Sequence, residues 1–177
     1  MEKYDITKTI KLPVGMHKLN DDAGISFQLN RLVNLDGCDP EVAREIGPTI
    51  KNTGEFYSVL KNRADKELAE GHLKNASALY RMAEFYTDWE DPAAWKKARE
   101  LFHQYYADFF SGDSPLVELI NVPYEGYTMP TLKFNPENSK GAIVMHGGFD
   151  SSYEEFFAEC EYLREHGYTV YLFKGPG

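Results

Sequence analysis

Two adjacent glycines follow an apolar run near the end of the chain, in the segment His146-Gly147-Gly148-Phe149. The run Ala142–Met145 predicts a strand, and the glycines predict a sharp turn directly after it. Because glycine has no Cβ, the backbone N–H groups of such a turn can approach another molecule closely. Such N–H groups can donate hydrogen bonds to a bound group, and this is the chemistry that the turn offers. The alternative interpretation is a turn selected only for its shape.

Nucleophilic side chains follow the turn, but their spacing does not form a catalytic set. Beyond Phe149 the serines and histidine are Ser151, Ser152 and His166, and all three lie within or beside one predicted helix. The sequence also contains no Gly-x-Ser-x-Gly motif, which is one sequence signature of a nucleophilic serine. These three residues are therefore not expected to form a triad.

The elements around the turn form a predicted β-α-β unit. Ser152 and Glu155 have the spacing of a helix capping box, although Asp150 or Ser151 could also act as the N-cap. We expect the helix to end at Gly167 and a second strand to cover residues 168–173. A strand, a helix and a second strand in this order predict a parallel strand pair.

A β-hairpin is predicted before this unit. Apolar residues of period two indicate a strand over 116–122, a turn over 123–126, and a returning strand over 127–134. The final strand of the chain is apolar on both faces, which is typical of an interior parallel strand.

The first two thirds of the chain have helical periodicity. Apolar residues spaced by three and four, with Asp-Pro and Gly punctuation, predict helices within 25–35, 39–47, 53–71, 73–86 and 91–112. We expect an extended or poorly ordered arm over 1–22, a helical domain over 23–112, and an α/β domain over 113–177. The fold class is therefore α/β, with an all-helical domain followed by the first strands of an incomplete sheet.

Aromatic residues form a stripe on the predicted helices. Core packing is the favoured interpretation of this stripe, and the alternative is that some members line an apolar substrate pocket. The candidates for that pocket are Tyr80, Tyr86, Trp95, Tyr105 and Phe109. His17, His72 and His103 have no metal-ligand spacing, so we expect no metal site.

Charge and composition exclude some classes of partner. The 177 residues have a net charge of −9, which argues against binding to nucleic acid or to an anionic membrane. No segment approaches the roughly 18 apolar residues of a transmembrane helix, and the start of the chain does not resemble a signal peptide. Cys38 and Cys160 are far apart in sequence and are expected to be free buried thiols. We therefore expect a cytoplasmic protein without a cofactor.

The order of these segments resembles a known family. A hairpin with Val-Pro-Tyr-Glu-Gly over 122–126, a strand entering His-Gly-Gly-Phe-Asp-Ser, and a closing Gly-Pro-Gly over 175–177 are similar to the α/β-hydrolases that carry an N-terminal helical domain. This group includes the fermentation–respiration switch-type esterases and dihydroxypseudooxynicotine hydrolase. Residues 71–72, 75–78 and 80–86 resemble the helical half of the same group.

The resemblance implies a serine-type hydrolase that acts on an ester, amide or activated C–C bond. Phe149 matches the position whose backbone N–H serves the oxyanion hole, and Gly147 and Gly148 match the turn that presents it. Asp150 would orient the substrate, although a role as helix N-cap is the favoured interpretation. The helical domain would act as a lid, and Tyr80 and Tyr86 would line the substrate pocket. His146 would be structural in this family, so we do not assign it as the base.

Three hypotheses follow from the missing nucleophile, acid and histidine. The favoured one is that the chain is the N-terminal portion of a longer hydrolase with a small ester or amide substrate. The second is a non-catalytic helical module that binds a partner. The third is a split hydrolase whose second chain supplies the missing residues. An exposed sheet edge would also favour association between copies of the chain.

Overall fold

The computed structural model describes residues 2–12, 15–34, 37–86, 92–148 and 151–175. Its internal contacts divide the chain into two compact units. The helical unit comprises Met1–Tyr4 and Pro13–Tyr105, and the sheet unit comprises Asp5–Leu12 and Tyr106–Gly177. The expected mixed α/β architecture, with helices followed by strands, is confirmed. The division falls at Tyr105–Tyr106, whereas the change of periodicity places the expected boundary at residue 112.

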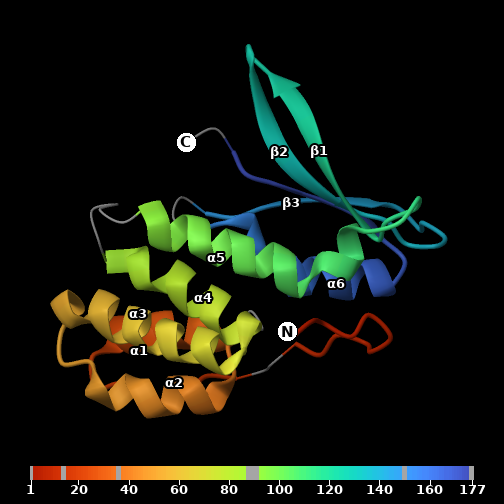
Figure 1. Cartoon of the computed structure of the whole chain (residues 1–177). Helices are drawn as coiled ribbons and strands as arrows, with labels where there is room; N and C mark the ends of the chain where they lie inside the picture. The colour runs from red at the N-terminus through yellow and green to blue at the C-terminus, as the bar shows by residue number, and fades with distance from the viewer. Residues whose placement is uncertain (1, 13–14, 35–36, 87–91, 149–150, 176–177) are drawn as a thin grey trace. The chain divides into compact units, whose positions relative to one another are not determined.

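Helices account for most of the helical unit (Figure 1). In chain order they are α1 (Ala23–Asn34), α2 (Pro40–Ile46), α3 (Thr53–Glu70), α4 (Leu73–Ala83) and α5 (Pro92–Tyr105), with 3-10 turns η1 (Gly47–Thr49) and η2 (Glu84–Tyr86). Helix α4 packs against both α3 and α5, so it forms the centre of this unit.

Helices end at the predicted glycine and begin at the predicted Asp-Pro pair, with one difference at Asp39. Gly71 ends α3 with φ of +88°, a conformation that glycine adopts without a steric penalty. Asp39 occupies the N-cap position of α2, with Pro40 as the first helical residue. The Asp39 side chain does not cap the helix, however, because its carboxylate accepts a hydrogen bond from Asn75 Nδ2 at 3.2 Å.

The core of the helical unit consists mainly of aliphatic and aromatic side chains that the helices provide. Its largest fully buried members are Ile25, Leu29, Leu32, Phe56, Leu60, Leu73, Leu79 and Met82. Cys38 is buried beside this core and forms no disulfide, as expected. Burial of about 25 cal/mol per Å² of apolar surface stabilises this packing.

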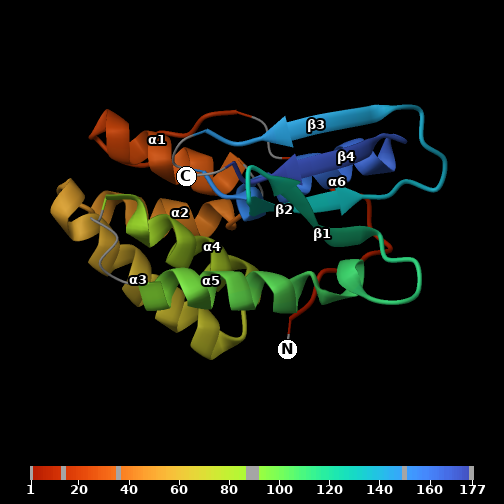
Figure 2. The ribbon, with the colours of Figure 1, turned by 90° about the horizontal axis from the view of Figure 1, so that it is seen from above.

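The sheet unit contains four strands and one α-helix among its described residues. Its elements are η3 (Ala107–Phe110), β1 (Val117–Tyr124), β2 (Tyr127–Phe134), β3 (Ala142–His146), η4 (Tyr153–Phe156), α6 (Phe157–Glu165) and β4 (Thr169–Phe173). The strand order is β1-β2-β4-β3, and Figure 2 shows these strands from above. β1 and β2 are antiparallel, β2 and β4 are antiparallel, and β3 and β4 are the predicted parallel pair.

Two sequence-based expectations need correction in this unit. The turn of the hairpin is two residues long, Glu125-Gly126, because both residues have positive φ and let β1 continue through Tyr124. The closing strand β4 is interior, as expected, but it does not present the free edge. β4 pairs with β2 on one side and β3 on the other, so the sheet edges are β1 and β3.

One face of the sheet is covered and contains the core of this unit. Residues Val170 and Leu172 of β4 are fully buried and align with Phe134 and Leu132 of β2. Helix α6 packs on this face through Phe157, whose ring lies 5.1 Å from that of Phe134. Tyr106 and Phe109 extend the aromatic cluster around Phe157, with ring centroids 4.3 and 5.2 Å away.

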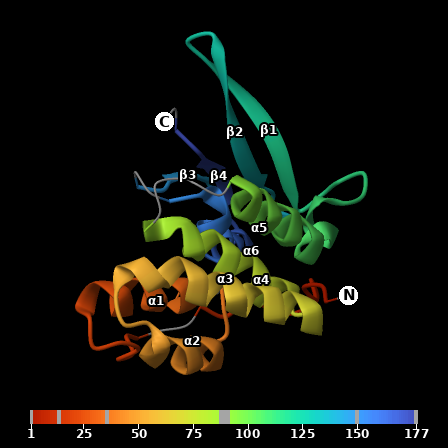
Figure 3. The ribbon, with the colours of Figure 1, turned by 60° about the vertical axis from the view of Figure 1, so that its left-hand side comes forward.

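The opposite face of the sheet is open among the described residues. Side chains alternate between faces along a strand, so Val144 of β3 and its partner Tyr171 of β4 point away from α6. Val144 is 70% exposed, and Tyr127 at the tip of the hairpin is 75% exposed. Only residues 131–134 of β2 pair with β4, so the outer half of the β1–β2 hairpin projects beyond the sheet, as Figures 1 and 3 show.

In the described ranges, no helix combines the length and the apolar character needed to cross a membrane.

Candidate functional site

The His-Gly-Gly turn follows the carboxyl end of β3, and its first glycine has no room for a side chain. A Cβ on Gly147 would overlap Ser151 Oγ and would lie 2.9 Å from Phe156 Cε2. Carbon atoms do not approach other heavy atoms so closely, so another residue would force Ser151 or the backbone to move. The close approach of residues 147 and 151 therefore requires glycine at position 147.

Two side chains hold the carbonyl groups of this turn. His146 Nδ1 lies 2.7 Å from the carbonyl oxygen of Gly147. Ser151 Oγ donates a hydrogen bond to the carbonyl oxygen of Gly148 at 2.9 Å. In a trans peptide the N–H points opposite to the C=O, so holding the Gly147 carbonyl also sets the direction of the Gly148 N–H. The turn is thus built to fix peptide orientation.

The remaining predictions for this segment concern Phe149, Asp150 and the capping box at Ser152. Phe149 and Asp150, the predicted oxyanion donor and substrate-orienting residue, lie outside the described residues. Ser152 is buried and occupies the N-cap position of η4, but its side chain makes no capping hydrogen bond, so its half of the predicted capping box does not form. The helical segment starts as a 3-10 turn at Tyr153 and becomes α-helical only at Phe157.

The serines and the histidine after the turn are far apart, as the sequence predicts. His166 lies at the C-cap of α6, where Nδ1 is 2.7 Å from the carbonyl oxygen of Tyr162. Ser151 and Ser152 precede the same helical segment. Fourteen residues at about 1.5 Å per residue separate its ends by roughly 20 Å. These side chains cannot act on one substrate atom.

The two tyrosines proposed for a substrate pocket lie in the helical unit. Tyr80 on α4 is buried, and its hydroxyl donates a hydrogen bond to Asp65 on α3. Burial and the Asp65 carboxylate raise the pKa of Tyr80, so its hydroxyl stays protonated. Tyr86 in η2 is half-buried, and its ring packs edge-on against Phe56 at 4.9 Å. Both tyrosines pack against helical residues.

A buried polar network joins three helices of the same unit. The Glu67 carboxylate of α3 is 2% exposed and accepts hydrogen bonds from Arg63 Nε at 2.6 Å and Asn75 Nδ2 at 3.0 Å. Asn75 also accepts from the backbone N–H of Asp39, at the start of α2, at 3.0 Å. His72 Nδ1 lies 2.9 Å from Glu67. Sequence reasoning missed this network, whose available signal was the Arg63–Glu67 spacing of four on one helix face.

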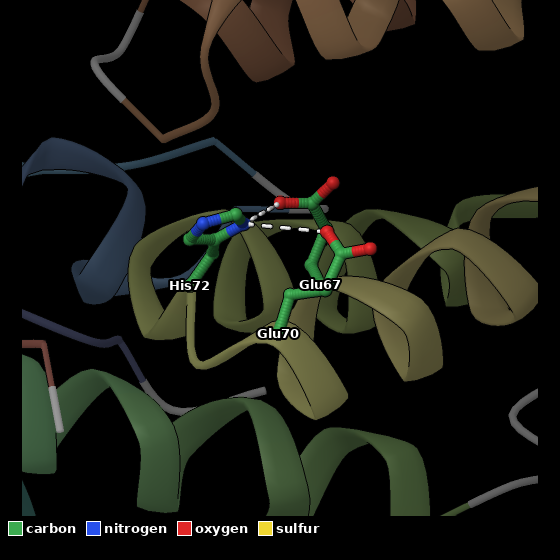
Figure 4. A group of neighbouring side chains, drawn as sticks. All are labelled: Glu67, Glu70 and His72. Carbon is green, nitrogen blue, oxygen red and sulfur yellow. Dashed lines mark hydrogen bonds and ion pairs between the residues drawn. The ribbon is translucent and has the colours of Figure 1, made fainter.

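Glu67, Glu70 and His72 form the group in the described residues whose donor atoms could together hold a metal ion (Figure 4). Each offers one ligand atom, and these atoms lie within 4.8 Å of one another. Both oxygens of Glu67 already accept hydrogen bonds, from Arg63 and from Asn75. Burial alone would raise the pKa of Glu67, but the bonds from Asn75, Arg63 and His72 outweigh burial and lower it. This group therefore connects α3 to α4 as a set of charge-assisted hydrogen bonds.

Two clefts in the sheet unit are lined by residues of strands, loops and α6. One of about 700 Å³ is lined by the acidic residues Asp113, Glu118 and Glu137 and by Arg164, among others. Arg164 forms a two-pronged ion pair with the buried Glu161, at 2.6 Å for each contact. A second cleft, of about 400 Å³, lies between the hairpin tip and Lys174.

Comparison with known proteins gives a fold and no family. No protein-family profile matches the sequence, and no curated protein sequence matches it significantly. Wild-type AbyA5 matches with a TM-score of 0.59 and 16% identity over 89% of this chain. A second AbyA5 structure has a TM-score of 0.55 and 18% identity over 80% of this chain. The 2,6-dihydroxy-pseudo-oxynicotine hydrolase has a TM-score of 0.45 and 19% identity over 82% of this chain.

The length of these proteins differs from that of this chain. The matched regions make up 45%, 42% and 45% of the three solved chains, so this chain spans less than half of each. The likeness to AbyA5, at a low sequence identity, concerns the fold. The helices followed by a four-stranded mixed sheet thus have the fold of part of AbyA5.

Proposed function

We propose that this chain is the N-terminal portion of a serine-type α/β-hydrolase that cleaves an ester, amide or C–C bond. The observation that carries the proposal is the His-Gly-Gly turn after β3, where Gly147 has no room for a side chain. In hydrolases of this class the turn after an early strand contributes one backbone N–H to the oxyanion hole. In this proposal the N–H of Phe149 is that donor, and Gly147 and Gly148 make the turn.

The contacts around the turn support its use as a preorganised donor. An oxyanion hole stabilises a transition state only when its N–H groups are oriented before the reaction begins. His146 and Ser151 hold the carbonyl oxygens of Gly147 and Gly148, at 2.7 and 2.9 Å. Both residues then act as positioning residues for the turn.

The open face and edge of the sheet support the proposal that more structure belongs here. A crossover connection places a helix on one face of a parallel strand pair, and all-parallel sheets are covered on both faces. β3 is a parallel strand at a sheet edge, and its Val144 is 70% exposed. We therefore propose that further strands and helices supply the nucleophile, the acid and the catalytic histidine. They would belong either to the same polypeptide or to a second chain.

The helical unit is proposed to cover the substrate. In the α/β-hydrolases with an N-terminal helical domain, that domain shapes the pocket, and Tyr80 and Tyr86 are the residues proposed for this role. The small-molecule substrate would be an ester or an amide. The buried hydroxyl of Tyr80 is bound to Asp65, so Tyr80 would act through the shape of the helical unit and Tyr86 through its partly exposed ring.

The experiment is intact mass spectrometry of the native gene product combined with a fluorophosphonate probe, which labels activated serines. We expect a product heavier than the 20.2 kDa of this chain, labelled by the probe, while the isolated 177-residue chain is not labelled. A product of 20.2 kDa that remains unlabelled both alone and in the native lysate would overturn the proposal. Labelling of a separate polypeptide that copurifies with a 20.2 kDa product would establish the split form of the hydrolase.

A further inference from the structure

The N-terminal segment changes unit twice before the first helix. Met1–Tyr4 belongs to the helical unit, Asp5–Leu12 to the sheet unit, and the chain from residue 13 to Tyr105 to the helical unit again. With the passage at Tyr105–Tyr106, the chain crosses between the units three times. A lid on a single linker needs only one crossing.

Within the helical unit, the segment that ends at Tyr4 is hydrogen-bonded to Tyr105, the residue at which the chain later leaves this unit. The backbone N–H of Tyr4 donates to the carbonyl oxygen of Tyr105 at 3.0 Å. The two rings meet edge to face, with centroids 6.2 Å apart. The Glu2 carboxylate also accepts the N–H of Lys74, at the start of α4, at 3.2 Å. Tyr4 and Tyr105 are the residues at which the chain leaves the helical unit.

Within the sheet unit, the segment Asp5–Leu12 is anchored to the end of α6. The backbone N–H of Ile10 donates to both carboxylate oxygens of Glu165, at 3.3 Å each. Glu165 is the last residue of α6, where the negative end of the helix dipole disfavours an acidic side chain. The Ile10 N–H provides a reason for a carboxylate at this position. Ile10 is also buried, with 4% exposure.

Residues 17–20, where the chain has returned to the helical unit, are also hydrogen-bonded and packed within that unit. The N–H of His17 donates to Asn30 Oδ1 at 2.6 Å, and Asn20 Nδ2 donates to the carbonyl oxygens of Gly47 and Ile50 at 2.7 and 2.8 Å. Leu19 between them is buried. The expected arm over residues 1–22 is therefore held at three successive points. We name residues 2–12 the N-terminal strap.

We propose that the N-terminal strap is a tether that limits movement of the helical unit relative to the sheet unit, with the Ile10–Glu165 contact as its latch. Units joined by one linker move relative to each other unless a large interface holds them. A strap anchored on both units restricts this motion because its length is fixed while its anchors hold. The inference goes beyond the proposed hydrolase function and does not depend on it.

The test measures the distance distribution between one spin label on each unit, in the full-length protein. Lys66 on α3 and Leu119 on β1 are exposed positions for cysteine labels, and the native Cys38 and Cys160 are buried. Glu165→Ala removes the carboxylate that accepts the Ile10 N–H, and Glu165→Gln keeps one acceptor oxygen. We expect a narrow distribution in the parent and Glu165→Gln proteins and a broad one in Glu165→Ala.

A matched pair of isoleucines in the strap provides the control. Ile10 is 4% exposed and Ile6 is 44% exposed, so Ile10→Ser should broaden the distribution and Ile6→Ser should not. Amide hydrogen exchange verifies that the latch is open. The Ile10 N–H should exchange roughly tenfold faster in Glu165→Ala, the factor expected for a hydrogen bond to a charged acceptor.

The outcomes separate a tether from a local contact. If the Ile10 amide exchanges faster in Glu165→Ala while the distance distribution stays as narrow as in the parent, the tether is wrong. The tether is equally wrong if Ile6→Ser broadens the distribution as much as Ile10→Ser. If Ile10→Ser does not fold, Glu165→Ala alone decides, because removing an acidic residue from the last turn of α6 should not by itself unfold that helix.

Discussion

Single residues in this protein show two kinds of constraint, one steric and one electrostatic. Gly147 is required because Ser151 Oγ occupies the space where a side chain would begin. Glu67 is required because its buried charge satisfies donors from Arg63, Asn75 and His72 at the junction of three helices. Neither constraint can be read from the residue type alone, since both depend on which neighbours the fold supplies.

Substitution of Gly147 tests the steric constraint. We expect Gly147→Ala to lower the free energy of unfolding by about 1–3 kcal/mol, because the new methyl group overpacks the turn. Urea unfolding followed by circular dichroism measures the change. Gly141→Ala is the matched control, because a Cβ on Gly141 meets nothing within 4 Å, and its effect should stay within about 0.5 kcal/mol. Ser151→Gly should restore part of the loss, and an additive double variant would contradict the proposed clash.

The pKa of Glu67 predicts a pH dependence of the helical unit. Hydrogen bonds lower this pKa below its ordinary value of 4.5, so the carboxylate stabilises the fold above that pH. This contribution is lost as the pH falls through the lowered pKa of the folded state. Glu67→Gln should cost about 1–3 kcal/mol at pH 7 and should flatten the decline in stability below pH 4.5.

Urea unfolding at a series of pH values measures this effect. Glu70→Gln is the control on the same helix, since Glu70 is half-exposed and its nearest partner His72 is 3.7 Å away. Equal pH profiles for the parent and Glu67→Gln would show that the network carries no net electrostatic stabilisation.

At the scale of elements, the β1–β2 hairpin shows how a short turn determines strand length. Glu125 and Gly126 have φ of 45° and 85°, which is the geometry of a two-residue hairpin turn. Pro123 was expected in the turn, yet it lies inside β1 opposite Thr128. A proline removes one backbone donor, which an edge strand such as β1 can tolerate.

The turn also contains a residue that is unfavourable for its conformation. Glu125 adopts a positive φ, which asparagine tolerates better than other non-glycine residues. We expect Glu125→Asn to stabilise the protein by roughly 0.5 kcal/mol, and Gly126→Ala to destabilise it by about 1 kcal/mol. The midpoint of urea unfolding measures both. If Glu125→Asn lowers the stability, the glutamate side chain makes a contact that contributes more to the free energy of unfolding than relief of the backbone strain does.

At the scale of the whole chain, the sheet has one covered face and one open face. The covered face carries α6 and fully buried residues such as Leu132 and Leu172. The open face presents Val144, with 70% exposure, on an edge strand. Exposed apolar surface on an unpaired edge favours association, either with further structure of the proposed hydrolase or between copies of this chain.

A charge on the open face tests this association in the isolated 177-residue chain. We expect Val144→Lys to weaken self-association by roughly tenfold, because burial of a valine side chain contributes about 1.5 kcal/mol. Sedimentation velocity over a range of concentrations measures the association constant. Phe27→Lys is the control, since Phe27 is 56% exposed on α1 of the helical unit. If Phe27→Lys has the same effect as Val144→Lys, the sheet face is not the site of association.

Local pattern was sufficient for most of the fold. Apolar spacing of three and four, together with Asp-Pro and Gly positions, predicted the five α-helices described in the helical unit, and period-two segments and apolar runs predicted the hairpin and the parallel strand pair. These elements depend on residues close in sequence, which is why a single chain reveals them. The glycines at 147 and 148 were also recognisable, because a sharp turn directly after an apolar strand favours residues without a Cβ.

Only the tertiary structure decided the features that join distant residues. The sequence did not show that β4 lies between β2 and β3, because pairing between strands depends on contacts across dozens of residues. It did not show the Glu67–Asn75–Asp39 network, nor that Glu165 binds the backbone of Ile10 across 155 residues. Hydrogen bonds and packing between remote segments leave no periodic pattern in the sequence. Which residues form these contacts is therefore known only from the folded structure.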